Sequence, residues 1–61
     1  MRLRMDREGH YIRAVIENND HEAVVRRWPW PNDDRGREVK FNEASEYVNR
    51  LAAVLACPVE L

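Results

Sequence analysis

Two histidines and one cysteine are the residues of this chain that most often bind metals. His10 and His21 lie in different parts of the N-terminal half, and Cys57 lies near the C-terminus. A structural zinc site needs ligands at short spacing, such as C-x₂-C or H-x₃₋₅-H, and no such pair occurs in the sequence. We therefore expect no metal and no cofactor, and we interpret both histidines as ordinary, partly exposed residues.

The candidates for nucleophilic catalysis are equally weak. We expect Ser45 in the first turn of a helix, where a serine more simply makes a local capping hydrogen bond. Cys57 follows an apolar run, a setting that does not favour the reactive thiolate. Asp33 and Asp34 lie in a polar stretch without a partner base, and no glycine-rich phosphate loop is present. We expect that the protein is not an enzyme.

Arginine and aromatic residues are the side chains that we predict to contact a partner. The chain has nine arginines and one lysine, and Arg, Tyr and Trp are enriched at binding hot spots. The predicted partner-binding residues are Arg2, Arg4, Tyr11, Arg13, Arg26, Trp28 and Trp30. The alternative is that cation–π contacts and side-chain stems merely cover the sheet, and that one tryptophan folds over the core.

The elements that position these residues are strands followed by one helix. Apolar and polar residues alternate in residues 1–5, 10–17, 21–28 and 37–41, which predicts four strands, the last one short. Apolar residues recur at helical spacing in residues 42–56, with Asn42 as the N-cap and Pro58 as the stop. The expected stripe of this helix is Ala44, Tyr47, Val48, Leu51, Val54 and Leu55.

These elements predict an α+β fold: an antiparallel β-meander of three to four strands with one C-terminal helix packed on one face. One domain covers residues 1–61, with the sheet in about 1–41 and the helix in about 42–56. A four-residue loop at 6–9 would place Leu3 opposite Ile12, and a turn at Asn18 and Asn19 would place Ile12 opposite Val25. Both hairpins then bury apolar residues on one face, and Arg2, Arg4, Tyr11, Arg13, Arg26 and Trp28 share the other.

Size and charge bound the remaining possibilities. A chain of 61 residues with one cysteine has no internal disulfide, and a domain this small is only marginally stable. Self-association through an edge strand or the open sheet face is one remedy, and a bound partner is another. The N-terminus lacks the apolar core of a signal peptide and no apolar run is long enough to cross a membrane, so we expect a cytoplasmic protein.

Three functional classes are compatible with this pattern. We favour a non-catalytic module that binds a larger protein or protein complex. A small nucleic-acid-binding regulator would use the Arg/aromatic face, because stacked aromatics and arginine also suit single strands. Against it stand a net charge of −1 and the lack of a known nucleic-acid-binding motif. A self-assembling structural subunit is the third class.

In size and element order the chain resembles the small inhibitor proteins of phages and mobile elements, of which anti-CRISPR proteins are one group. The resemblance covers the whole chain but includes no shared motif. It implies a stoichiometric inhibitor that blocks a Cas protein or effector complex, often by denying access to target DNA. Acidic residues would then be candidates for imitating DNA phosphates. These candidates are Glu17, Asp20, Glu22, Asp33 and Asp34.

Overall fold

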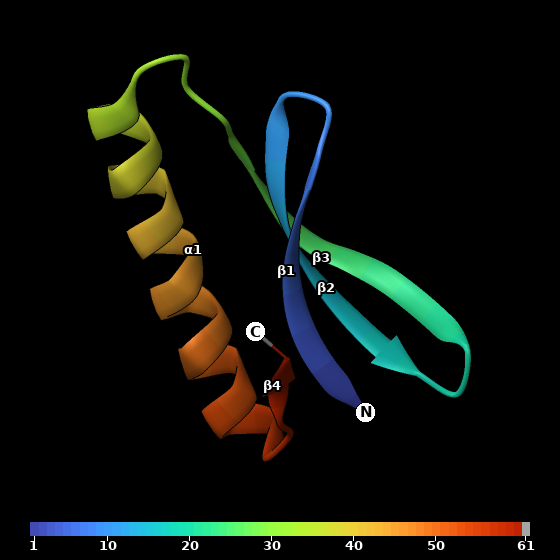
Figure 1. Ribbon diagram of the computed structural model, residues 1–61. Coiled ribbons are helices and arrows are strands. Elements are labelled where there is room, and N and C mark those ends of the chain that lie inside the picture. Colours follow the sequence, from blue (N-terminus) through green and yellow to red (C-terminus); the bar gives the residue numbers. More distant parts are fainter. Residues whose placement is uncertain (61) are drawn as a thin grey trace.

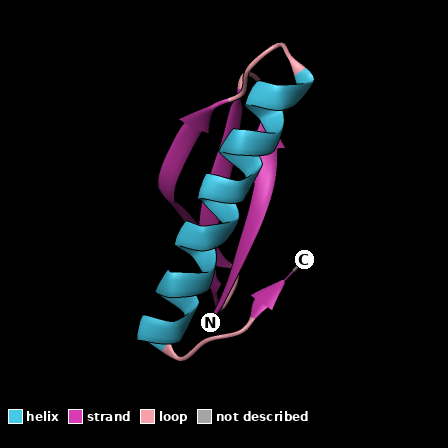
Figure 2. Ribbon diagram, turned by 90° about the vertical axis from the view of Figure 1, so that its left-hand side faces the viewer, coloured by secondary structure: helices cyan, strands magenta, loops and turns pink. Residues whose placement is uncertain are grey.

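The computed structural model, which describes residues 1–60, is a four-stranded sheet with one long helix across a single face (Figures 1 and 2). Its elements are β1 (Arg2–Glu8), β2 (Tyr11–Asn18), β3 (His21–Pro29), α1 (Asp34–Leu55) and β4 (Val59–Glu60). The sheet order is β3-β2-β1-β4; the first three strands form the expected antiparallel meander, and β4 adds in parallel to β1. The predicted α+β fold is therefore confirmed.

Both hairpin turns differ from the sequence prediction. The first turn has two residues, Gly9 and His10, instead of four, and the second is formed by Asn19 and Asp20 instead of Asn18 and Asn19. Gly9 has a φ of 60°, and Asn19 and Asp20 have φ of 49° and 67°, the left-handed geometry of tight hairpin turns. Leu3 consequently lies opposite Ile16 rather than Ile12. The slip is an even number of residues, so Leu3 keeps its predicted face, because side chains alternate with a period of two.

A β-bulge in β3 changes the prediction for its second half. Val15 pairs with Val24 but Ala14 pairs with Arg26, so Val25 is an extra residue. Beyond the bulge Ile12 lies opposite Trp28, not opposite Val25. Trp28 and Arg26 therefore lie on the helix-facing side, and their predicted place on the open face is wrong.

Helix α1 begins eight residues earlier than predicted, because Asp33 rather than Asn42 is its N-cap. The Asp33 carboxylate accepts from the Gly36 N–H at 2.8 Å, and the Asp33 C=O accepts from the Arg37 N–H at 3.0 Å. A Cβ on Gly36 would lie 2.7 Å from that carboxylate and 2.9 Å from Pro31, so the cap needs glycine here.

The predicted strand at 37–41 is therefore wrong: these residues belong to the first half of the helix. A run of five alternating residues fits both the strand period of two and the helix period of 3.6 residues. The cap at Asp33 places this run in the helix. Val39 and Phe41, expected inside a sheet, are 49% and 48% exposed. At the other end, Ala56 takes the left-handed conformation (φ 53°) and the Cys57 N–H donates to Ala52 O, which ends the helix before Pro58.

The core lies between α1 and the helix-facing side of β1, β2 and β3. Its buried members are Leu3, Ile12, Ala14, Trp28, Ala44, Val48 and Ala52. The alanines let the helix approach the sheet closely, and Tyr47 and Leu51 pack at the margin as predicted. Val54, predicted to belong to the helix stripe, is 81% exposed.

Candidate functional site

The open face of the sheet, opposite α1, contains most of the predicted partner-binding residues. The strand register places on it Arg2, Arg4, Tyr11, Arg13, Val15, Glu17, Glu22, Val24 and Arg27, together with Asp6, Glu8 and Glu60. Arg27 was not among the predicted residues; the bulge brings it to this face in place of Arg26. A bulge at the second of two adjacent valines leaves no signal in a single sequence, so the pattern could not predict this exchange.

Arg4 is the centre of one ion-pair cluster on this face. Its guanidinium binds Glu17, lies 2.9 Å from the Glu22 carboxylate and lies 3.3 Å from Asp6. Arg2 also contacts Glu17, at 3.4 Å, and reaches Glu60 on β4 at 3.2 Å. The hydrogen bond from Arg4, chiefly, holds the pKa of Glu17 below its ordinary value.

Arg13 makes the second cluster. Its Nε and one terminal nitrogen each lie 2.7 Å from an oxygen of Asp6, the bidentate geometry that gives strong arginine–carboxylate pairs, and the other terminal nitrogen lies 2.6 Å from Glu8. This hydrogen bonding is the main reason that the pKa of Asp6 is lowered, against the opposing effect of burial. The arginines are thus occupied by carboxylates of the same face.

Val15 shows that these ion-paired side chains form a cover. It lies on the open face between Arg4 and Val24, yet it is only 1% exposed. Its neighbours on this face are Arg4 and Val24 on the adjacent strands and Arg13 and Glu17 on β2, and long arginine stems can cover an apolar side chain in this way. The alternative interpretation made from the sequence, that arginine stems cover the sheet, therefore describes Arg4 and Arg13.

Tyr11 and Arg27 are exposed residues of the open face that contact each other. The Arg27 guanidinium lies 5.1 Å from the centre of the Tyr11 ring, and Tyr11 is 43% exposed. A shallow hollow of about 560 Å³ adjoins them. Its lining residues are Glu8, Gly9, His10, Tyr11, Arg13, Val24 and Arg27.

Trp28 and Arg26 form a separate cluster with Tyr47 of α1. Trp28 is 5% exposed, so it is the tryptophan that folds into the core. The Arg26 guanidinium lies 5.2 Å from both the Trp28 and the Tyr47 ring centres, and covers the outer side of this aromatic pair. Contacts within the protein therefore explain why an arginine and a tryptophan occupy these two positions.

Trp30 lies apart from the open face, beside a groove between β1 and α1. The guanidinium groups of Arg7 and Arg37 lie 5.7 and 5.6 Å from its ring, and Arg37 also donates to the Pro31 carbonyl at 2.9 Å. Its indole Nε1 is covered and has no acceptor within residues 1–60. We call this feature the Trp30 groove; it has a volume of about 350 Å³ and is lined by Met5, Asp6, Arg7, Ile12, Trp30, Phe41 and Glu60.

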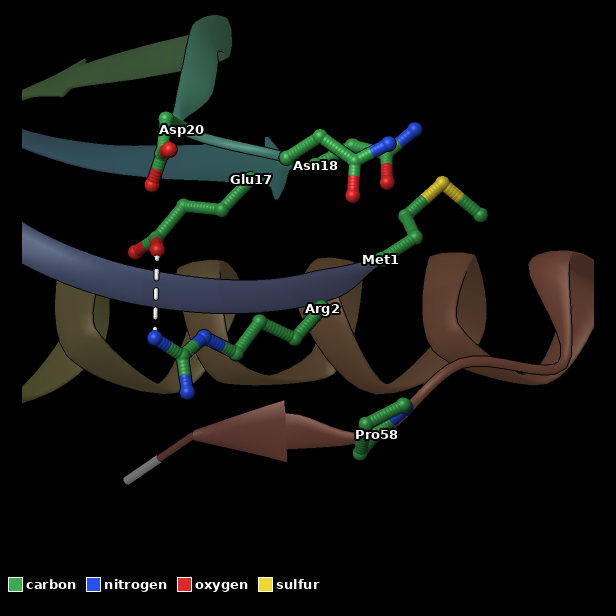
Figure 3. A pocket seen from close by; sticks show the side chains of 7 residues that line it. Met1, Arg2, Glu17, Asn18, Asp20 and Pro58 are labelled. Carbon is green, nitrogen blue, oxygen red and sulfur yellow. Dashed lines mark hydrogen bonds and ion pairs between the residues drawn. The ribbon is translucent and has the colours of Figure 1, made fainter.

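The predicted acidic residues do not form one surface. Asp33 caps α1 and Asp34 lies in its first turn, where negative charge is favoured by the helix dipole. Glu22 contacts Arg4, and Glu17 and Asp20 line a pocket at the start of β1, where Glu17 contacts Arg2 (Figure 3). No row of free carboxylates is formed by these five residues.

The residues considered for catalysis or metal binding lie far apart in the fold. His10 is in the first hairpin turn and His21 begins β3, while Ser45 contacts Met5 and Cys57 is half-buried after α1. Within residues 1–60, no three His, Cys, Asp or Glu side chains gather into a metal-binding group. None of the helices in that range is long and apolar enough to cross a membrane.

No protein-family model, curated protein or solved structure matches this chain. The surfaces themselves are therefore the basis for inferring what the protein does.

Proposed function

We propose that the protein is a small, non-catalytic protein-binding module, and that it docks an extended segment of a larger partner in the Trp30 groove. The observation that carries the proposal is the position of this groove. It is an apolar channel that runs beside a stretch of strand edge with no neighbouring strand among residues 1–60.

The uncovered strand edge belongs to β1. Within residues 1–60, β4 pairs with Leu3 and Arg4 alone, and β1 continues from Met5 to Glu8 beyond these pairs. The Leu3 N–H donates to Pro58 on this side at 2.9 Å, and backbone direction repeats every two residues, so the backbone groups of Arg7 point to the same edge. β4 shows that the edge accepts a parallel strand, and a partner segment would continue the sheet where β4 stops.

The groove also offers a side-chain contact. Phe41 is 48% exposed on α1 and faces the groove with Met5 and Trp30. A large apolar side chain of the docked segment would fill this space, while backbone hydrogen bonds to β1 would fix its direction. This division of roles is typical of strand addition, in which pockets for alternate side chains supply specificity.

The charge of the open face favours a protein partner over nucleic acid. Its four arginines, Arg2, Arg4, Arg13 and Arg27, are balanced by five carboxylates, Asp6, Glu8, Glu17, Glu22 and Glu60. Among residues 1–60, all of these arginines except Arg27 form ion pairs. A phosphate backbone would have to displace these carboxylates, and the salt-dependent gain from counterion release would be correspondingly reduced.

A module of this kind acts by occupying a surface of its partner. Stoichiometric inhibition of a larger complex, as in the anti-CRISPR proteins, is one form of such action and stays a prediction. The contact that we propose is with an extended segment that carries a large apolar side chain.

Selection from a library of random displayed peptides tests the proposal. We expect peptides with a large apolar residue to be enriched, and their affinity to fall about tenfold or more in the Phe41→Ser variant. Val54→Ser is the matched control, because Val54 is an exposed apolar residue of the same helix outside the groove. Bound peptide should also slow amide exchange at Met5 and Arg7, whose N–H groups point to this edge. Selected peptides that bind Phe41→Ser as well as wild type would refute docking in the groove.

A further inference from the structure

We propose that β3 is a self-complementary edge through which two copies of this chain form a symmetric dimer. The proposal concerns the edge of the sheet opposite to the Trp30 groove and does not depend on the function proposed for that groove. β3 is the outermost strand, nine residues long, and no strand among residues 1–60 covers its outer side. Figure 1 shows it reaching away from α1 toward the second hairpin turn.

The outer edge of β3 has free backbone groups at defined positions. Asn18 and His21 close a two-residue turn, so their backbones face each other and those of Glu22 and Val24 face outward. Beyond the bulge, the Trp30 N–H donates to His10 O at 2.7 Å. In this half of β3 the backbone N–H and C=O groups of even-numbered residues therefore point toward β2, and those of Arg27 and the C=O of Pro29 point outward. Pro29 has no N–H to leave unpaired, which suits the end of such an edge.

The sequence of β3 matches itself when a second copy runs antiparallel. With Glu22 opposite Arg27 of the second copy, Val24 lies opposite Val25 at the centre. Glu22 and Arg27 both lie on the open face, opposite Glu17 and Arg13 of β2, so their side chains meet on one side of the joined sheet. The two-fold axis repeats the pair, and each dimer has two Glu22–Arg27 contacts.

The bulge makes this arrangement geometrically possible. Glu22 has an even number and Arg27 an odd one. In a regular strand, where backbone direction alternates from residue to residue, the N–H and C=O of one would therefore point toward β2 and those of the other outward. The extra residue at Val25 turns both outward, so the two residues of each pair can exchange backbone hydrogen bonds. In the register shifted by two residues, Glu22 would face Pro29 and Arg27 would face Val24, and both charge pairs would be lost.

Exposed apolar side chains lie at the centre of this edge. Val24 and Val25 are 43% and 40% exposed, and in the dimer they would be covered by the same residues of the second copy. The joined sheet would have eight strands, with both helices on one face and the two open faces merged on the other. A marginal domain of this size gains stability from such an assembly.

Sedimentation of charge-reversal variants tests the dimer and its register. Wild type should form a dimer as concentration rises through the micromolar range. Glu22→Arg places Arg opposite Arg, and Arg27→Glu places Glu opposite Glu, so each variant alone should need about tenfold or more concentration to dimerise. An equimolar mixture of the two variants restores both charge pairs in a heterodimer, and should associate nearly as well as wild type.

Matched controls separate the edge from general charge effects. Glu38→Arg and Arg35→Glu make the same changes at exposed positions of α1 and should dimerise like wild type. Because Glu22 also contacts Arg4, circular dichroism must show that Glu22→Arg is folded. Amide exchange supplies a readout that needs no variant: the amides of Glu22, Val24 and Arg27 should exchange more slowly at high than at low protein concentration.

Three results would overturn the proposal. The first is a wild-type monomer at about 1 mM, where even a weak dimer would be populated. The second is a dimer that persists unchanged in both reversal variants. The third is a failure of the folded variants to associate when mixed, which would show that Glu22 does not face Arg27.

Discussion

The ring of Trp28 meets the ring of Tyr47 edge-on, with centroids 5.3 Å apart and an interplanar angle of 73°. The pair joins β3 to α1, and it exists because the bulge at Val25 turns Trp28 toward the helix. Edge-to-face pairs add to the free energy gained by burying the rings. The contact therefore makes Trp28 a core residue rather than an anchor for a partner.

Trp28→Ala should lower the free energy of unfolding by about 3–5 kcal/mol, most of the stability of a domain this small. Urea denaturation followed by circular dichroism measures the loss. Tyr11→Ala removes an exposed aromatic from the open face and should cost less than about 1 kcal/mol. A larger loss for Tyr11 than for Trp28 would contradict the assignment of the two faces.

Stability should fall in acid because of the open-face ion pairs. The pKa values of Asp6 and Glu17 are below their ordinary values of 3.8 and 4.5 in the folded protein. Their contribution is therefore complete above about pH 5 and is lost as the pH falls below about 4, where the folded protein must take up protons. Asp6→Asn should flatten this part of the stability curve, whereas Asp20→Asn, in the exposed turn, should leave it unchanged.

The start of α1 can be tested with two substitutions. Asp33→Ala should cost about 0.5–2 kcal/mol, because the Gly36 N–H loses its acceptor. Asn42→Ala should change stability by less than about 0.5 kcal/mol, since Asn42 is an exposed residue inside the helix. Thermal denaturation of the two variants compares them directly. The opposite order of effects would restore the helix start that the sequence suggested.

Ala56→Gly should stabilise the protein. Ala56 has a φ of 53°, a left-handed conformation in which an alanine Cβ costs about 1 kcal/mol and a glycine does not. Part of this gain is offset by the greater freedom of glycine in the unfolded chain, so an increase of a few tenths to about 1 kcal/mol is expected. Chemical denaturation measures it, with Ala53→Gly, inside the helix, as a destabilising control.

Random single- or double-stranded DNA should not bind measurably near physiological salt. Three of the four open-face arginines, Arg2, Arg4 and Arg13, already pair with carboxylates, so little charge is free for phosphate. Fluorescence anisotropy of labelled oligonucleotides at several salt concentrations provides the test. Micromolar binding with a log–log salt slope of about −3 or steeper would support the nucleic-acid alternative, because the slope counts neutralised phosphates.

The sequence also located part of the candidate surfaces. Arg2, Arg4, Tyr11 and Arg13 lie on the open face as expected, because an even register slip leaves the face of every strand residue unchanged. The Trp30 groove could not be found in this way. Its walls, Met5, Trp30 and Phe41, come from three separate segments, and Phe41 itself was assigned to a strand.

The sequence by itself determined the three-stranded meander, the presence of one helix after it and the inward face of β1 and β2, because period-two alternation and turn residues are local signals. It did not determine the fourth strand, which was expected at residues 37–41 and lies instead after the helix, at Val59–Glu60. Tertiary structure alone decided three features. The bulge at Val25 moved the side chains of Arg26 and Trp28 from the open face to the helix-facing side. The cap at Asp33 extended α1 back over residues that also fit a strand. Pairing across strands brought the arginines of each open-face cluster next to their carboxylates. Each depends on which groups meet in space, and a short stretch of sequence that fits two periods cannot specify that.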